Sequence, residues 1–162
     1  MPTSGLEQLD DRDTFKVPRR FFLAIFVFCL VGTGAELLLL EHFEGFWQKV
    51  PLILMLASLI ALGWHFLNRR PASVRVFQGM MILLLTGGGA GLILHFLGNV
   101  EFEREMHPDA AGFRLFVDAL MGATPALAPG TMMQLGLLGL AYTYRHPALV
   151  SRNLAVNKGE IK

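Results

Sequence analysis

The feature that most constrains this chain is a set of four long apolar stretches that carry almost no charge, at residues 21–40, 51–67, 74–97 and 127–144. Each stretch holds 17 to 24 residues. At a rise of about 1.5 Å per residue, helices of that length cross a hydrocarbon core of about 30 Å. Backbone polar groups cannot stay unpaired in lipid, so such stretches must be helical. We therefore expect an all-α fold, a compact bundle of four transmembrane helices.

Composition agrees with a membrane location. The 162 residues fit a single domain and are 53 % apolar, with only 17 % charged, whereas a soluble domain carries about 25 % charged residues. The net charge of +1 gives no electrostatic basis for a nucleic-acid partner. The lone cysteine, Cys29, lies inside an apolar stretch, and we expect it to be a packing residue.

Lysine and arginine are distributed unevenly among the segments outside the four stretches. Eleven of the fourteen lie in the N-terminal segment, the second loop and the C-terminal tail, and only Lys49, Arg104 and Arg114 lie in the other two loops. Basic residues favour the cytoplasmic side of a membrane. This pattern predicts that both termini are cytoplasmic.

The chain accordingly divides into three parts. We expect a cytoplasmic segment at 1–20, a four-helix membrane domain at 21–145 and a cytoplasmic tail at 146–162. The expected location is the cytoplasmic (inner) membrane of a bacterium, with the lipid bilayer as the first partner.

The third loop, at residues 98–126, is the longest and mixes charged with large apolar residues. Apolar side chains recur there at helical spacing, with Arg114 and Asp118 on the opposite face. This pattern predicts a short amphipathic helix on the outer membrane surface. The apolar positions are 113, 116, 117, 120 and 121.

A run of small residues, 87–91, lies in the third apolar stretch. Small residues let helices approach closely in lipid, so we expect this run to pack against another helix. The alternative is a groove in which a lipid tail, quinone or pigment approaches the backbone. No lysine follows the run, so it is not a phosphate-binding loop.

Ionisable residues inside membrane spans point to a functional site, because their burial is costly. Glu36 and His95 lie at matching depths near the outer ends of the first and third stretches. Imidazole and carboxylate ligands suit zinc, iron or manganese, although the spacing matches no defined motif. The structural alternative is a hydrogen bond of Glu36 with His95 or with a backbone group, beside a solvated acidic loop. The candidate metal ligands are Glu36, His42, His95, Asn99 and Glu103.

Haem is a less favoured cofactor. Histidines pair by depth, His42 with His95 near the outer face and His65 with His146 near the inner face. A buried macrocycle needs ligands well inside the spans, whereas His42 and His146 lie at or beyond the span ends. Pro147 also follows His146 directly and disfavours a helical conformation there.

No hydrolase triad or other catalytic motif is recognisable, so we expect a protein that is not an enzyme. The favoured hypothesis is an accessory or scaffold subunit, as a homo-oligomer or within a larger membrane complex. The alternative is a protein that binds a metal or cofactor (iron, zinc, haem or quinone) through the outer Glu/His cluster. A second alternative is an oligomeric cation pathway through Glu36.

Overall fold

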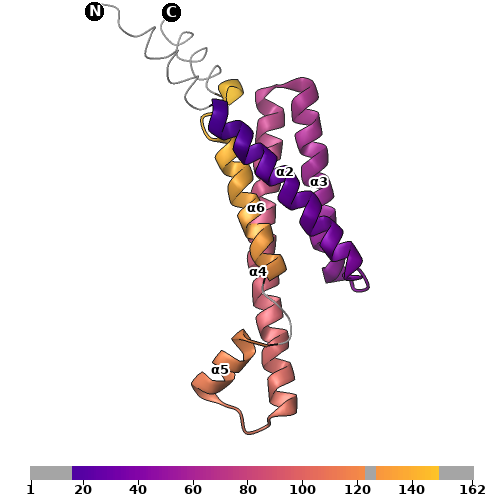
Figure 1. Cartoon of the computed structure of the whole chain (residues 1–162), viewed down its shortest axis with the longest axis vertical. Coiled ribbons are helices and arrows are strands. Elements are labelled where there is room, and N and C mark those ends of the chain that lie inside the picture. Colours follow the sequence, from indigo (N-terminus) through magenta and orange to yellow (C-terminus); the bar gives the residue numbers. More distant parts are fainter. Residues whose placement is uncertain (1–15, 123–126, 150–162) are drawn as a thin grey trace, which may run out of the picture.

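The computed structural model describes residues 16–122 and 127–149, and these parts are helices joined by turns (Figure 1). Three helices are long and apolar enough to cross a membrane: α2 from Val17, α3 and α4. This confirms an all-helical fold for the described residues, with three candidate membrane-spanning helices. The helices are α2 Lys16–Leu39, α3 Phe46–Asn68, α4 Pro71–Met106, α5 Gly112–Leu120 and α6 Leu127–Thr143.

Helix α4 forms the axis of the molecule (Figure 1). α3 precedes α4, and the tight turn between them makes the two helices antiparallel. α6 packs along α4. α2 crosses the bundle diagonally, so it contacts α6 near its own start and α3 near its own end. α5 lies against the far part of α4, beyond the other helices.

Glycines bring α4 and α6 into backbone contact. A Cβ atom added at Gly88 would lie 2.6 Å from the carbonyl oxygen of Pro129. One added at Gly136 would lie 2.6 Å from the carbonyl oxygen of Met81. Only glycine fits at such distances, which is how small residues promote helix association in lipid.

The core lies where α2, α4 and α6 cross. Phe26 of α2 and Phe77 of α4 are fully buried, and their rings meet edge to face with centroids 5.6 Å apart. Cys29 is half-buried and packs against this core, as predicted. Other buried members are Leu30, Met81, Leu84 and Leu135.

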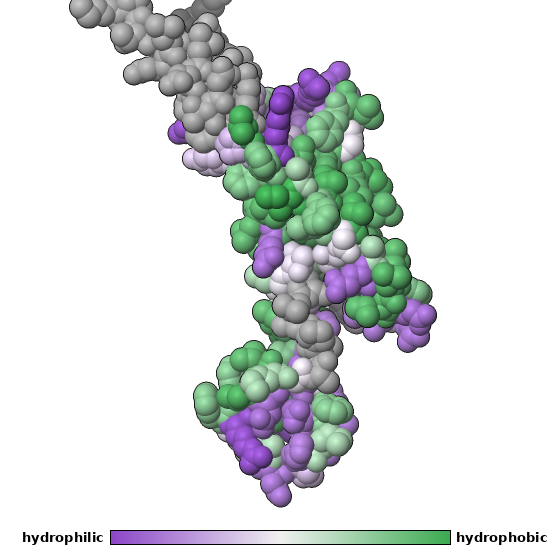
Figure 2. Space-filling view, viewed as in Figure 1, coloured by the Kyte–Doolittle hydropathy of each residue, from purple (hydrophilic) through white to green (hydrophobic). Residues whose placement is uncertain are grey.

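The carboxylates and most of the arginines lie at opposite ends of the bundle. Figure 2 shows apolar side chains gathered over its middle. We call the end that carries α5 the acidic end, because every carboxylate in the described ranges lies there or at the α2–α3 turn. We call the opposite end the basic end. The acidic residues are Glu36, Glu41, Glu44, Glu101, Glu103, Glu105, Asp109 and Asp118. The arginines of the basic end are Arg19, Arg20, Arg69, Arg70, Arg75 and Arg145.

Two helices extend past their apolar stretches. α4 continues to Met106, although apolarity ends at residue 97. Residues 101–105 are mostly glutamate and arginine, which favour helix, and Pro108 supplies the break. The helix therefore continues about two turns past the span predicted at 74–97.

α3 begins at Phe46, five residues before its apolar stretch. Pro51 is therefore inside the helix, and its missing N–H leaves the Trp47 carbonyl without its usual donor. The predicted segment 1–20 and tail 146–162 lie largely outside the described residues.

Candidate ligand pocket at the acidic end

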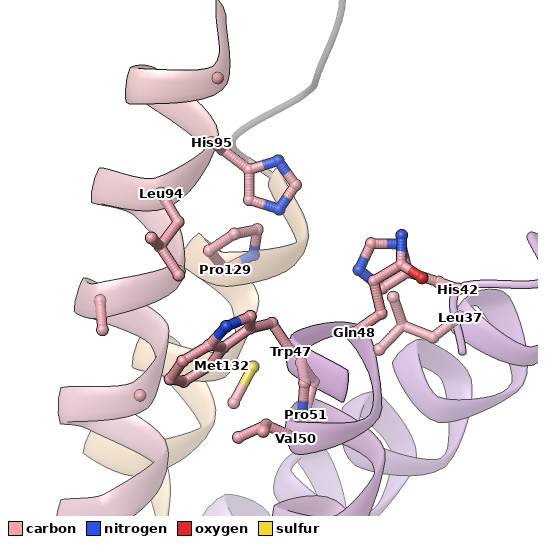
Figure 3. Close-up of a pocket in the computed structure, with 14 residues that line it drawn as sticks. Leu37, His42, Trp47, Gln48, Val50, Pro51, Leu94, His95, Pro129 and Met132 are labelled. Atoms are coloured by element: carbon pink, nitrogen blue, oxygen red, sulfur yellow. The ribbon is translucent and has the colours of Figure 1, made fainter. Parts of the chain in front are cut away.

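A cavity of about 400 Å³ lies between α3, α4 and α6, near the turn that follows α2 (Figure 3). The diagonal course of α2 creates the space, because α2 has left α6 by this level and has reached α3 (Figure 1). Cavities of this size accommodate small ligands.

Small residues of α4 form the floor of the pocket. Gly87, Ala90, Gly91 and Gly98 line it, so the surface of α4 is recessed here. Gly88 packs on α6, and Gly87 and Gly91 lie close to other helices as well, because an added Cβ would be 3.1 Å from Leu54 Cδ1 and 3.4 Å from Pro129 Cβ respectively. The glycine run therefore contributes both to helix packing and to the lining of the pocket.

The walls are apolar and open to the outside. Val50 and Pro51 of α3 face Pro129 and Met132 of α6 across the cavity. At the rim, Trp47 and Leu94 keep 71 % and 50 % of their surface exposed. The pocket therefore opens onto the apolar helix surface rather than being sealed inside the protein.

Two histidines supply most of the polarity. His42 follows α2, His95 lies on α4, and both side chains reach the cavity (Figure 3). Their ring centroids are 6.3 Å apart, and the ring planes lie within 16° of parallel. Each neutral imidazole carries one donor and one acceptor nitrogen, so the pair can bind oxygen atoms of either kind.

Gln48 of α3 adds a further polar group. The Gly45 N–H donates to Gln48 Oε1 at 2.8 Å, which leaves the amide nitrogen of Gln48 as a donor for a ligand. The two imidazoles and the Gln48 amide thus supply hydrogen-bonding groups to an otherwise apolar cavity.

The structure brings two of the five predicted metal ligands together, His42 and His95. Glu36 is exposed on α2. Asn99 is buried and donates from Nδ2 to the carbonyl oxygen of Ala119 at 3.0 Å. Among the residues that the structure describes, no three His, Cys, Asp or Glu side chains are grouped closely enough to hold a metal ion.

Glu103, the fifth predicted ligand, lies 3.3 Å from His107 Nδ1, one helical turn away. The predicted hydrogen bond between Glu36 and His95 does not form either, since Glu36 lies outside the pocket that His95 lines.

Both histidine pairs that share a depth are side by side. The rings of His65 and His146 have centroids 4.9 Å apart, compared with 6.3 Å for His42 and His95. The four histidines therefore define two separate sites, one at each end of the bundle.

The α3 wall was not predicted from the sequence. Trp47, Gln48 and Pro51 line the pocket because α3 starts at Phe46 rather than at residue 51. The only sequence signal for them was Trp47, whose amphipathic ring favours a membrane interface.

Comparison with protein-family models gives no match for this chain, and neither curated proteins nor solved structures give one.

Proposed function

We propose that this protein is a four-span membrane protein that holds an amphipathic, quinone-like molecule in the pocket at the acidic end, as an accessory subunit of a membrane complex. The observation that carries the proposal is the pocket itself. Its apolar floor opens onto apolar helix surface, and His42, His95 and Gln48 line the same cavity.

α6 would be the fourth span. Its described length, Leu127–Thr143, corresponds to about 26 Å at about 1.5 Å per residue. Gly136 packs against α4 at Met81 and Leu85, well inside the apolar stretch of α4. Helices in contact at that level share the same depth, so α6 would cross the bilayer beside α4.

The separation of charge supports the orientation. The arginines of the basic end favour the cytoplasm under the positive-inside rule. The pocket would then face the outer leaflet of a bacterial inner membrane, with His95 two residues from the end of its apolar stretch.

The chemistry of the walls favours a quinone ring over a metal. Ring oxygens can accept hydrogen bonds from the imidazole N–H groups and from the Gln48 amide. The apolar tail would leave between Trp47 and Leu94 into lipid. A haem would also need cations for its propionates, and none of the described residues that line the pocket is a lysine or an arginine.

α5 supports an interfacial position for this part of the chain. Phe116 of α5 contacts Phe96 of α4, with ring centroids 5.5 Å apart, and Phe113 keeps 80 % of its surface exposed. Because Phe96 belongs to the apolar stretch of α4, these rings continue the lipid-facing surface. α5 would therefore rest on the outer leaflet.

Fluorescence titration tests the proposal. In a Trp64→Phe background Trp47 is the sole tryptophan, and it lines the pocket. We expect saturable quenching by decylubiquinone added to the protein in mild detergent.

Two glycines of the same helix provide a variant and its control. Gly91→Leu would fill the pocket, and we expect it to weaken decylubiquinone binding at least about tenfold. Gly89 has no heavy atom within 4 Å of an added Cβ, so Gly89→Leu should bind normally. Quenching that does not saturate, or that responds equally to both variants, would refute quinone binding. A Soret band in the purified protein would assign the histidines to haem instead.

A further inference from the structure

A second cavity, also about 400 Å³, lies at the basic end between the ends of α3 and α6. His65, Arg69, Tyr142 and His146 line it. α3 ends at Asn68 and α6 at Thr143, so this cavity is level with the ends of the helices. In a bilayer this is the level of the lipid headgroups.

The hydrogen bonds of His65 fix which nitrogen carries its proton. His65 is 96 % buried, being only 4 % exposed, and its Nδ1 lies 3.1 Å from Ser73 Oγ. The Ser73 hydroxyl donates to the carbonyl oxygen of Arg70 at 2.8 Å, so it must accept from His65. Nδ1 therefore carries the proton, and Nε2 is left as an acceptor.

His146 has the opposite arrangement. The Ala148 N–H donates to His146 Nδ1 at 3.3 Å, so the proton of the neutral ring is on Nε2, which is a donor. The rings of Tyr142 and His146 are adjacent, with centroids 5.8 Å apart. The cavity thus combines an acceptor from His65 with donors from His146, Tyr142 and Arg69.

The surrounding charge selects an anion. The basic end holds six arginines and, within the described ranges, no carboxylate. Arg19 is already used, because it donates to backbone carbonyl oxygens of Tyr142 and Tyr144. Arg69 lines the cavity and has an exposed side chain. A metal cation would be repelled by these groups, whereas a phosphate would be attracted.

We infer that this cavity binds the headgroup of an anionic phospholipid, with the phosphate on Arg69 and Tyr142 and a headgroup hydroxyl donating to His65 Nε2. A phosphate ester free in solution has the same chemistry. The position of the cavity at the helix ends, on the membrane surface of the bundle, favours the lipid. This inference does not depend on the ligand of the other pocket.

Native mass spectrometry of the delipidated full chain distinguishes the sources. We expect phosphatidylglycerol to be retained about tenfold better than phosphatidylcholine, the effect of one charge-assisted hydrogen bond. Glycerol 3-phosphate at the same concentration should not bind measurably. Equal retention of the two lipids would overturn the inference, and tight binding of glycerol 3-phosphate would overturn the lipid as its source.

Matched variants distinguish binding by the residues of the cavity from general attraction of the lipid to the positively charged surface. Arg69→Gln should abolish the preference for phosphatidylglycerol, whereas Arg75→Gln removes the same charge from an exposed side chain outside the cavity and should keep the preference. Tyr142→Phe keeps the ring packing and should weaken retention through the lost hydroxyl. Equal losses for Arg69→Gln and Arg75→Gln would show that only surface charge acts.

Discussion

Arg19, in the first turn of α2, donates a hydrogen bond from Nε to the carbonyl oxygen of Tyr142, 3.1 Å away in the last turn of α6. Its Nη2 donates to the carbonyl oxygens of Tyr144 and Arg145 at 3.1 and 3.2 Å. The last carbonyls of a helix have no donor within it. Arg19 therefore caps α6 although it lies 123 residues before Tyr142 in the chain.

Replacing Arg19 with glutamine should destabilise the bundle. The change removes charge-assisted donors from carbonyls at a helix end, and we expect a loss of about 1–3 kcal/mol. Thermal unfolding in dodecyl maltoside measures it. Arg20→Gln removes the same charge from an exposed neighbour, and its melting temperature should stay close to that of the parent. If both variants melt alike, the cap does not contribute.

Gly136→Ala should destabilise the contact between α4 and α6. The added Cβ would lie 2.6 Å from the Met81 carbonyl oxygen and 2.9 Å from Leu85 N, both of them backbone atoms. Relief requires the helices to separate, which costs about 1–3 kcal/mol. Gly89→Ala meets no atom within 4 Å and should be neutral or slightly stabilising, because alanine favours helix. Unfolding curves of the two variants that coincide with the parent would contradict close packing.

Stability should fall as the pH decreases through the range in which His146 titrates. Burial, the neighbouring His65 and the Arg19 charge lower the pKa of His146 from 6.5 to about 4. The folded state therefore binds fewer protons than the unfolded state between these values. The stabilisation is complete above pH 6.5 and is lost as the pH falls towards 4.

His146→Gln provides the control for that titration. Other groups face His146 from α2, α3 and α6, namely Arg19, His65, Arg69 and Tyr142. The variant retains all of them but lacks the titrating ring, so its melting temperature should depend less on pH between 7.5 and 4.5. Parallel pH profiles for the parent and the variant would rule out this role.

Asn99 should hold α5 against α4. Its buried side chain donates to the Ala119 carbonyl oxygen at 3.0 Å, and a Cβ at Gly122 would lie 2.8 Å from Asn99 Cγ. In Asn99→Ala we expect the amides of α5 to exchange hydrogen faster while those of α6 keep their protection. Asn68→Ala, at the exposed end of α3, is the control. Unchanged exchange in α5 would show that other contacts hold it.

The proposed topology predicts which sites face the outside of the cell. In a Cys29→Ser background, Asp109→Cys should react with a membrane-impermeant maleimide added to intact cells. Asn68→Cys, at the exposed end of α3 at the basic end, should react only after the cells are opened. The reverse labelling pattern would indicate the opposite orientation, and labelling of both cysteines in intact cells would contradict the proposed topology.

The features that could be predicted from the sequence are those that depend on hydropathy and on depth in the membrane. Apolar runs located the three helices that are long and apolar enough to cross a membrane. Equal depth paired His42 with His95 and His65 with His146. Hydropathy does not mark where a helix ends in water, so the apolar stretch alone does not give the end of α4 at Met106. A groove at the glycine run was one of the two interpretations of that run, but the α3 wall of the pocket was not predicted. That wall depends on which helices lie side by side and on the start of α3 at Phe46, and hydropathy gives neither.

The crossing of α2 over the bundle also sets the order in which the protein can be assembled. Chains are synthesised from the N-terminus, so α2 is made well before α6, the helix that it caps and packs against. Until α6 arrives, α2 has few neighbours, and the Arg19 side chain has no carbonyls to bind. In a chain interrupted before α6, α2 would therefore keep only its contacts with α3 and the contact of Phe26 with Phe77 of α4. Only a chain that includes α6 can form the contacts between α2 and α6 and the cap that Arg19 provides.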